Sequence, residues 1–481
     1  MSPSTPRPLL RSPLGYLVMA GLALVGWAPL AGQQVDTFSP DLAAKVDAAI
    51  TDVMNKTQVP SASIGIVRDG RVAYVRAFGK ATLSPPVPAS PEMHYAIGSI
   101  SKQFTVAAVM LLVQDGRMSI DDPVSRWFPE LTRANEVTVR NLMSHTSGYE
   151  DYAPQDYTIP AWTKPTTAQA VVHEWATKPL DFDPGTQYQY SNTNFNIVGL
   201  IVEKVSGQPF WSFLKSRVLD PVGLMHTIDL DTQHDLLEPT GYFRYALGPV
   251  RPAIMEAPGW YFADGELAMP VTDLLTWDIS MIDQSLLQPS SYAEMGKPTK
   301  LKNGRESAYG LGLSVGDLNG HRVLSHTGEV GGFVASNVVI PDQKYAVAVL
   351  TNQEASPAAS AISRAIGSVL LQPSADGSDD TAAAEALARR VLADLQKGTI
   401  DRSLFTANAN FYFDQQGLSD FATSLGPLGE IKSLRQTATS LRGGMRYRGF
   451  AAEFANGTRV NLSTYLTDDG KIEQFLVEPA S

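Results

Sequence analysis

The chain contains no cysteine, so neither a disulfide bond nor a lipid-modified cysteine is available to it. Basic residues are not in excess either: the formal net charge is −11 over 481 residues, which excludes the electrostatic footprint of a nucleic-acid-binding protein. The seven histidines show no metal-site spacing, because His173-Glu174 lacks a second histidine four residues on. We therefore expect no metal, no cofactor and no nucleic-acid partner.

Two sequence patterns of other enzyme classes are also missing. No G-x-S-x-G elbow occurs, which argues against an α/β-hydrolase, and no glycine-rich nucleotide-binding loop is present.

A long apolar run occurs once, over residues 14–30, after Arg7 and Arg11. This pattern predicts a signal peptide over residues 1–32, cleaved near residues 31–34, and hence a periplasmic or secreted bacterial protein without a stable membrane span. The alternative is an uncleaved N-terminal membrane anchor.

The composition of the rest of the chain is that of an ordinary globular protein, with 44% hydrophobic and 18% charged residues. Its length allows two to three domains. Residues 372–380 have the composition of a linker. We therefore predict a large domain over residues 33–371 and a small C-terminal module over residues 381–481.

Hydrophobic periodicity predicts an α+β fold for the large domain. We expect a helix from Pro40 to about Lys56, a hairpin around Asp69-Gly70, and a fully buried helix over residues 104–113. Further segments are expected as strands at residues 62–67, 72–78, 321–324, 334–340 and 345–350, and as a helix at residues 355–371. The pattern indicates an antiparallel sheet flanked by helices, with a mainly helical insertion between its first and last strands.

The C-terminal module is expected to be a small α+β unit. It should contain a helix over residues 381–397 and strands over residues 446–454, 459–466 and 472–477. Its pattern resembles nuclear-transport-factor-2-like cones. No catalytic set is visible in it, so we predict a packing or interaction role.

The main candidate for catalysis is the segment Ser99-Ile100-Ser101-Lys102, just before the apolar helix. Residues three apart share one face of a helix, so Lys102 can reach the Ser99 hydroxyl. A lysine whose pKa is lowered by desolvation can take the proton of a serine and make it a nucleophile.

Other interpretations of these serines exist. Ser99 could be a helix N-cap, and Ser101 is a neighbouring serine that points to another face of the helix. Ser212-Phe213-Leu214-Lys215 repeats the S-x-x-K pattern, but no proton relay follows it at a similar distance. We interpret this second match, in a short amphipathic helix after Gln208-Pro209, as having no catalytic role.

Two further triplets follow in order, Tyr190-Ser191-Asn192 and His326-Thr327-Gly328. Together with Ser99 and Lys102 they resemble the penicillin-recognising serine hydrolases, whose triplets are S-x-x-K, Y-x-N and K-T-G or a variant. The resemblance is nearest to the class C β-lactamase-like branch, which includes D-alanyl-D-alanine carboxypeptidases, D-aminopeptidases and esterases. It extends over about residues 40–370 and includes matches at residues 142–148, 184–194, 309–312 and 331–333.

The resemblance implies a transpeptidase-like architecture and a set of roles. Ser99 would attack an acyl carbonyl, Lys102 would take its proton, and Tyr190 would relay a proton to the leaving group. Asn192 would hydrogen-bond the substrate amide and orient Lys102, and it could also cap the following helix. The remaining positions would bind substrate: the backbone N–H groups of Ser99 and Glu329 as an oxyanion hole, His326 and Thr327 as a wall, and Gly328 as a point of close substrate approach. His145, in the matching segment at residues 142–148, would have a structural role.

The substrate class stays open between D-amino-acid peptides, esters and β-lactams. A peptide of the cell wall would belong to the first of these classes. A histidine at position 326 holds a substrate carboxylate only when it is protonated or through a neutral hydrogen bond, which weakens the case for β-lactams. Aromatic residues in Pro- and Gly-rich loops could rim an acyl pocket: Tyr149, Tyr152, Tyr157, Trp162, Trp260, Tyr261 and Phe262. The alternative function is a catalytically silent relative that binds cell-wall peptides or a protein partner. The sequence does not indicate an oligomeric state.

Overall fold

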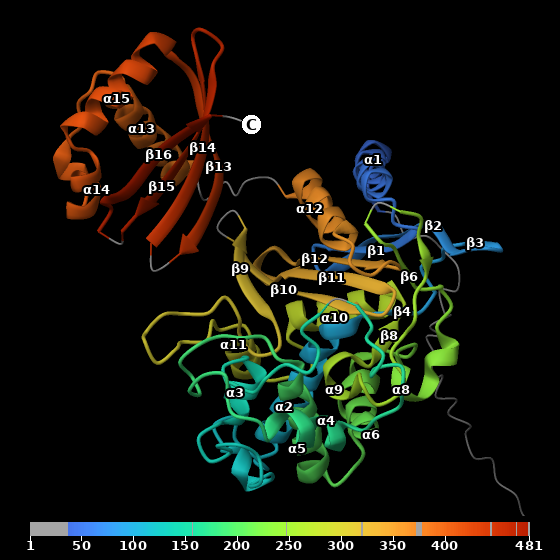
Figure 1. Cartoon of the computed structure of the whole chain (residues 1–481). Helices are drawn as coiled ribbons and strands as arrows, with labels where there is room; N and C mark the ends of the chain where they lie inside the picture. Colours follow the sequence, from blue (N-terminus) through green and yellow to red (C-terminus); the bar gives the residue numbers. More distant parts are fainter. Residues whose placement is uncertain are drawn as a thin grey trace, which may run out of the picture. The chain divides into compact units, whose positions relative to one another are not determined.

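The computed structural model describes residues 37–155, 157–246, 248–318, 321–371, 378–442, 445–467 and 469–479. The predicted signal peptide and residues 372–377 of the predicted linker lie outside these ranges. The main sheet has seven strands in the order β3-β2-β1-β12-β11-β10-β9, and each neighbouring pair is antiparallel (Figure 1). The strands are β1 Ser61–Arg68, β2 Arg71–Leu83, β3 Pro86–Pro88, β9 Ser314–Leu318, β10 His321–Val330, β11 Phe333–Ile340 and β12 Tyr345–Thr351.

The predicted hairpin is confirmed between β1 and β2. Asp69 and Gly70 both have positive φ, 54° and 74°, a combination that glycine and aspartate tolerate and that matches the twist of a tight hairpin. The expected central strands are confirmed as well. β10 is longer than predicted and reaches Val330, so the whole His326 triplet lies on a strand.

Helices cover both faces of the sheet. On one face lie α1 (Pro40–Thr57) and α12 (Ala358–Leu370), and on the other lies α10 (Val271–Asp283) (Figure 1). Side chains alternate along β12: Val347 shares a buried cluster with residues of α1 and α12, whereas Ala348 shares one with residues of α10. All residues of β12 are buried, as expected of a strand covered on both sides.

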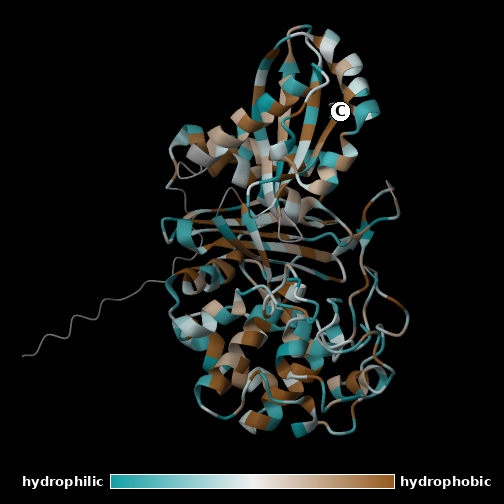
Figure 2. Ribbon diagram, turned by 90° about the vertical axis from the view of Figure 1, so that its left-hand side faces the viewer, coloured by the Kyte–Doolittle hydropathy of each residue, from teal (hydrophilic) through white to brown (hydrophobic). Residues whose placement is uncertain are grey.

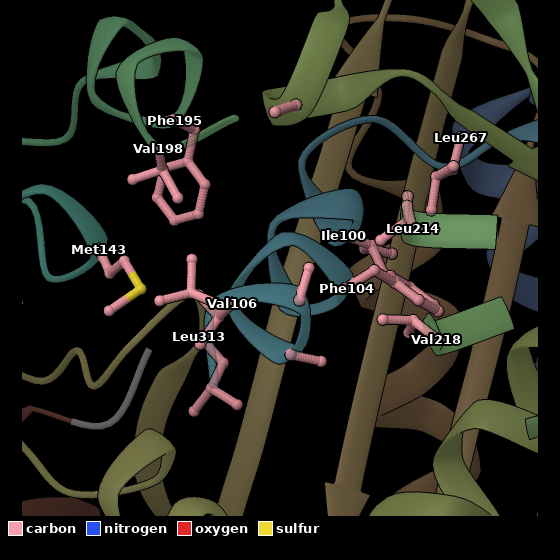
Figure 3. Packing of buried hydrophobic residues seen from close by; sticks show 14 of the residues in the cluster. Ile100, Phe104, Val106, Met143, Phe195, Val198, Leu214, Val218, Leu267 and Leu313 are labelled. Atoms are coloured by element: carbon pink, nitrogen blue, oxygen red, sulfur yellow. The ribbon is translucent and has the colours of Figure 1, made fainter. Parts of the chain in front are cut away.

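The insertion between the strands is mainly helical, as predicted. Besides α10, its α-helices are α2 Ser101–Gln114, α3 Val139–Met143, α4 Ala168–Ala176, α5 Asn192–Ser206, α6 Phe210–Leu214, α7 Asp220–Val222, α8 Leu230–Gln233, α9 Phe262–Gly265 and α11 Pro289–Met295. Residues 101–112 of α2 are all buried. Figure 3 shows Phe104 and Val106 of this helix within the apolar core. Removing a core phenylalanine such as Phe104 costs about 3–5 kcal/mol, so α2 is a rigid base for the residues at its start.

Short strands hold the start of α2 against a distant segment. β4 (Tyr95–Ala96) pairs with β8 (Leu267–Met269), and β8 pairs with β5 (Ile228–Asp229). A separate pair joins β6 (Tyr242–Phe243) to β7 (Arg251–Pro252). Since β4 leads directly into the Ser99 turn and α9 leads into β8, this pairing fixes both segments at the same place.

The C-terminal module has its own hydrophobic core. It contains α13 Ser378–Leu395, α14 Ala407–Tyr412 and α15 Gln415–Leu425, and an antiparallel sheet of β13 Ile431–Arg442, β14 Met445–Phe454, β15 Arg459–Leu466 and β16 Ile472–Pro479. The predicted helix and three strands are confirmed, and β13 was missed. Its register shifts twice, so the polar and apolar residues do not alternate regularly along it.

Hydrophobic residues follow the strands and the helices, and hydrophilic residues dominate many of the connecting loops (Figure 2). Among the helices that the structure describes, none combines the length and the apolarity that crossing a bilayer requires.

Candidate active site

Ser99 and Lys102 meet at the start of α2. Ser99 lies in η1, a short 3-10 turn over Gly98–Ile100 that leads directly into the helix. The Lys102 ammonium donates to the Ser99 hydroxyl with an Nζ–Oγ distance of 2.9 Å. The side chain of Ser99 does not cap the helix, because the N-cap position is Ile100 and makes no side-chain bond. The Ser99 hydroxyl therefore contacts the Lys102 amine and does not cap the helix.

Lys102 is fully buried, and its other two donors also have acceptors. Nζ donates to Asn192 Oδ1 at 2.7 Å and to the backbone oxygen of Asp264 at 2.8 Å. Burial lowers the pKa of Lys102 to about 8, against the opposing effect of nearby carboxylates, of which Asp264 has the largest influence. The lysine can therefore lose its proton much more easily than one in water.

Asn192 is the first residue of α5, and Ser191 is the N-cap. The expectation that Asn192 caps this helix was wrong, because its side chain instead joins Lys102 to Asp151. Asp151 Oδ1 accepts from the Asn192 backbone N–H at 2.9 Å and from its Nδ2 at 3.2 Å. The amide of Asn192 thus has its oxygen toward the lysine and its NH2 group toward a carboxylate.

Tyr190 lies beside the serine and the lysine. Its ring centre is 5.1 Å from Lys102 Nζ, and its buried hydroxyl lies near the Ser99 hydroxyl. Burial raises the pKa of Tyr190 far above its usual value, while the nearby Ser99 hydroxyl opposes the shift. Tyr190 is therefore a neutral phenol at ordinary pH and can donate a proton, whereas Lys102 is the better base.

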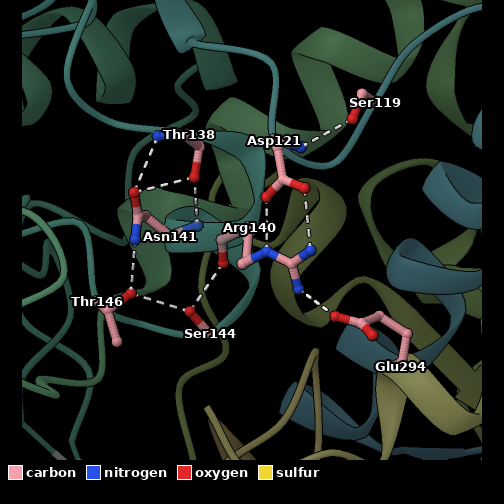
Figure 4. Close-up of polar contacts among 8 residues, drawn as sticks. All are labelled: Ser119, Asp121, Thr138, Arg140, Asn141, Ser144, Thr146 and Glu294. Carbon is pink, nitrogen blue, oxygen red and sulfur yellow. Dashed lines mark hydrogen bonds and ion pairs between the residues drawn. The ribbon is translucent and has the colours of Figure 1, made fainter. Parts of the chain in front are cut away.

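The segment around His145 holds Tyr190 and its neighbours in place. A capping box of Thr138 and Asn141 starts α3, and Asn141 Nδ2 also donates to Thr146 Oγ1 at 3.0 Å (Figure 4). Next to Thr146, His145 Nδ1 accepts from the Ser191 backbone N–H at 3.1 Å. The ring of His145 is 4.1 Å from that of Tyr190. His145 therefore contacts the Tyr190 triplet, which is consistent with the structural role predicted for it.

His326 is buried on β10 and is neutral. Its Nδ1 bonds to the backbone oxygen of Thr327, and its Nε2 lies 2.8 Å from the Tyr309 hydroxyl. Since the carbonyl oxygen only accepts, Nδ1 carries the proton and Nε2 accepts from Tyr309. Burial and the Lys102 charge lower the pKa of His326 to about 4. At neutral pH this histidine thus offers no positive charge to a substrate.

Gly328 has a different role from the one expected. A Cβ at this position would lie 1.7 Å from the Ile97 backbone oxygen and 3.0 Å from the Ser99 nitrogen. The close approach is therefore made by the chain's own η1 turn, and Gly328 does not line the cleft. At Gly98, a Cβ would lie 2.7 Å from the Glu329 nitrogen. The two glycines thus allow the η1 turn and β10 to pack closely against each other, at the place where the backbone amides of Ser99 and Glu329 lie.

A cleft of about 510 Å³ opens above these residues. The predicted site residues that line it are Ser99, Tyr190, Asn192, His326, Thr327 and Glu329. Five of the predicted aromatic residues also line it: Tyr152, Tyr157, Trp162, Trp260 and Tyr261. Two were assigned wrongly, because the Tyr149 hydroxyl bonds to the Thr132 backbone oxygen and the Phe262 ring packs 5.3 Å from that of Phe210.

The wall of the cleft is acidic. Its carboxyl groups belong to Asp151, Glu256, Asp264, Glu329 and Glu354, and no described lining residue is lysine or arginine. Burial raises the pKa of Asp264 to about 8, in spite of the neighbouring lysine. The Tyr152 hydroxyl lies 2.5 Å from the Trp260 oxygen and 2.9 Å from Asp264 Oδ2. A protonated Asp264 satisfies this arrangement, because one hydroxyl proton cannot serve two acceptor oxygens.

The other serines lie elsewhere. Ser101 is buried, and its oxygen accepts from the Leu267 backbone N–H at 3.2 Å. Ser212 is exposed, and Lys215 is paired with Asp220 at 2.5 Å. Neither serine has a lysine available as a base.

Sequence reasoning missed Asp151, Asp264 and Tyr309 as residues of the site. Asp151 stands three residues after the segment that contains His145, which is a possible signal. Asp264 contributes a backbone oxygen, for which no side-chain pattern exists. Tyr309 was noted only as part of a sequence match.

Comparisons with known sequences show the family of this chain. The Beta-lactamase family model matches residues 46–371. The chain is 31% identical to a D-aminopeptidase of Cereibacter sphaeroides over 66% of its own length and 61% of the relative, and 26% identical to that of Gluconobacter oxydans over 65% and 60%. It therefore spans less than two thirds of these relatives. It is also 26% identical to penicillin-binding protein 4* of Bacillus subtilis, over 84% of this chain and 92% of that protein.

Solved structures show the same fold. The octameric penicillin-binding protein homologue from Pyrococcus abyssi has a TM-score of 0.59 at 22% identity, covering 90% of this chain and 99% of that one. A D-stereospecific amidohydrolase from Streptomyces has a TM-score of 0.58 at 26% identity, covering 69% and 99%. The fold, the ordered triplets and the family match together show that this chain belongs to the Beta-lactamase family of serine hydrolases.

Proposed function

We propose that the chain is an exported serine hydrolase that cleaves amide or ester bonds through an acyl-enzyme on Ser99. The observation that carries the proposal is the buried Lys102 amine, 2.9 Å from the Ser99 hydroxyl at the floor of a cleft. A serine needs a neighbouring base to become a nucleophile, and a buried lysine with a pKa of about 8 is suited to that task.

The acylation step follows from these positions. Neutral Lys102 takes the proton of Ser99 while Oγ attacks the carbonyl carbon, and the backbone N–H groups of Ser99 and Glu329 stabilise the oxyanion. One such donor is commonly worth about 3 kcal/mol in the transition state. Tyr190 gives its proton to the leaving nitrogen or oxygen as the bond to carbon breaks, and it regains a proton from Lys102. Water then attacks the ester, and the acid product leaves Ser99.

The charges of the cleft favour some substrates over others. Besides the protonated Asp264, four carboxyl groups line it without a lysine or arginine among the described lining residues, and His326 is neutral. A substrate anchored by a carboxylate, such as a β-lactam or a D,D-carboxypeptidase peptide, would find no cation here besides Lys102. Amides or esters that are neutral or carry an ammonium group fit better. The relatives named D-aminopeptidase support D-amino-acid amides or short peptides as the first substrates to try.

Export rests on Arg7, Arg11 and the apolar run over residues 14–30. We expect the mature protein in the periplasm or the medium, with an N-terminus near Gln33. N-terminal sequencing of the protein from its native host tests this directly. Recovery of chains that still begin at Met1 in the membrane fraction would instead show an uncleaved anchor.

Covalent labelling tests the hydrolase itself. The protein is treated in parallel with a fluorophosphonate and with a fluorescent penicillin, and the labelled peptide is identified by mass spectrometry. We expect fast fluorophosphonate labelling at Ser99 and slow or no penicillin labelling. No label at Ser99 from either probe would favour the alternative, a catalytically silent binding protein.

A further inference from the structure

Lys102 can act as a base toward Ser99 only if its lone pair has the right direction. The protonated amine has three N–H bonds and three acceptors, Ser99 Oγ, Asn192 Oδ1 and the Asp264 backbone oxygen. The neutral amine keeps two N–H bonds and one lone pair. Asn192 Oδ1 and the Asp264 oxygen carry no proton, so they hold the two N–H bonds. The lone pair then faces the Ser99 hydroxyl.

This arrangement depends on the orientation of the Asn192 amide. The oxygen and the NH2 group of an asparagine have nearly the same size, so half a turn of the amide changes its chemistry and hardly its shape. A turned amide would direct an N–H group at Lys102. The lysine lone pair would then accept from Asn192 and would no longer be available to Ser99.

Asp151 is the group that prevents this turn. Its Oδ1 accepts from Asn192 Nδ2 at 3.2 Å, and its Oδ2 is 3.4 Å from the same nitrogen. A turned amide would place the Asn192 oxygen against these carboxylate oxygens, with no proton between them. Asp151 is itself held, because Oδ1 also accepts from the backbone N–H groups of Asn192 at 2.9 Å and Ala153 at 3.1 Å.

We propose that Asp151 is a positioning residue of the reaction: its carboxylate fixes the Asn192 amide and so directs the lone pair of Lys102 at Ser99. The proposal rests on the proposed function, since it assigns Asp151 a role in the acylation step. It differs from a purely structural role, in which Asp151 would only anchor the backbone at the start of α5.

The variant Asp151→Asn separates these roles. It keeps an oxygen that can accept from the backbone N–H groups of Asn192 and Ala153, so folding should be little changed. It also replaces Oδ2, 3.4 Å from Asn192 Nδ2, by an NH2 group that repels the NH2 group of Asn192 and can donate to a turned amide oxygen. The only acceptor left for the unturned amide is Oδ1 at 3.2 Å, which two backbone N–H groups already share, so the turned amide is favoured. We expect the rate of Ser99 labelling by a fluorophosphonate to fall about 10–100-fold, the scale of a misdirected catalytic group.

A reciprocal exchange provides the sharper test. In the double variant Asp151→Asn, Asn192→Asp, the new carboxylate at 192 accepts from the new NH2 group at 151 on one side and from Lys102 on the other. We expect it to label at least about tenfold faster than either single variant at its own best pH, by restoring the match of donor and acceptor. Its pH profile should move to higher pH, because a carboxylate in contact with Lys102 raises the pKa of the lysine. Asp151, Asp264 and Glu266 act on Lys102 in the same direction in the wild-type protein. The exchange removes the charge of Asp151 and places one in direct contact with Lys102, while Asp264 and Glu266 are unchanged.

Glu150→Gln is the matched control. It removes a carboxylate next to Asp151 in sequence, whose side chain is paired with Lys178 at 3.2 Å on the surface, and labelling should keep the wild-type rate. Wild-type labelling of a folded Asp151→Asn variant, or a double variant no faster than the single variants, would overturn the positioning role. Absence of Ser99 labelling in the wild-type protein would instead overturn the proposed function, and this role with it.

Discussion

The same S-x-x-K pattern occurs twice in this chain, and the two copies differ in burial and in the partners of the lysine. Ser99 and Lys102 lie at the start of a buried helix, where the lysine is fully buried and donates to the serine. Ser212 and Lys215 lie on the surface, where the lysine side chain is 45% exposed and is paired with Asp220. A surface ion pair of this kind is worth about 0–1 kcal/mol, and it directs the Lys215 amine at a carboxylate and not at Ser212.

The difference shows what turns a motif into a site. Helical spacing brings a lysine within reach of a serine in both places. At Lys102, however, burial lowers the pKa to about 8, and two proton-free acceptors hold its remaining N–H bonds. The surroundings of the lysine, and not the pattern itself, make it a base.

Replacing each serine gives the largest expected contrast. Ser99→Ala removes the nucleophile, so hydrolysis of a nitrophenyl ester should fall by about 10⁴–10⁶-fold. Ser212→Ala should hydrolyse the ester at the wild-type rate. An equal loss in both variants, or a Ser99→Ala rate within about tenfold of wild type, would reject the contrast.

Replacing each lysine should give nearly the same contrast. Lys102→Ala leaves the Ser99 proton without an acceptor, and residues that act as one unit lose nearly all activity singly, so we again expect a loss of about 10⁴-fold or more. Lys215→Ala removes a surface pair and should not change the rate. Steady-state ester hydrolysis, with circular dichroism to verify folding, measures both. A Lys102→Ala variant that stays active would move the base elsewhere.

A smaller effect is expected at the two neighbouring tyrosines. Tyr190→Phe removes a proton donor beside Ser99 and should lower kcat by about 10²–10⁴-fold on an amide substrate. On a nitrophenyl ester, whose leaving group needs no proton, the loss should be smaller. Tyr188→Phe is the control, since Tyr188 does not line the cleft. Equal losses on both substrates would argue against proton transfer by Tyr190.

The smallest effect concerns a buried acid outside the cleft. Asp278 on α10 accepts from Asn337 Nδ2 at 2.7 Å, and burial raises its pKa to about 8. Between its ordinary pKa of about 4 and pH 8, the folded chain holds a proton that the unfolded chain releases, so this group lowers stability as pH rises. Asp278→Asn should raise the unfolding midpoint by about 2–4 °C at pH 8 and by less at pH 5.

The exposed Asp235→Asn is the control for that measurement and should leave the midpoint unchanged at both pH values. A larger gain at pH 5 than at pH 8 would contradict the raised pKa of Asp278. Activity should not change in either variant. Unchanged activity would show that the raised pKa of Asp278 has no catalytic meaning, because Asp278 lies outside the cleft and away from the nucleophile.

Much of the fold was predictable because its signals are local. The Asp69-Gly70 turn, the β12 strand and the uniformly apolar α2 each follow from a few consecutive residues. β13 was not predictable in the same way, since two register shifts break its alternation of polar and apolar residues. The sequence of a strand does not show at which residue its pairing with the neighbouring strand will shift in register.

The candidate site was predictable where side chains form ordered triplets. The role of Gly328 was not, because the backbone that occupies the space beside it comes from Ile97, far away in sequence. Asp264 contributes a carbonyl oxygen, which every residue has. Asp151 acts on Lys102 only through Asn192. Its proposed role therefore depends on contacts in the folded chain, which cannot be predicted from the spacing of residues along the sequence.

The proposed mechanism depends most on Lys102 as the base that activates Ser99, and the pH dependence of labelling tests this directly. The second-order rate of fluorophosphonate reaction at Ser99 is followed by mass spectrometry from pH 5 to pH 11. Only the neutral amine can take the proton, so the rate should rise with pH and level off, with a midpoint near the Lys102 pKa of about 8. A midpoint at the ordinary lysine pKa of about 10.4, or a label on another residue, would contradict the account.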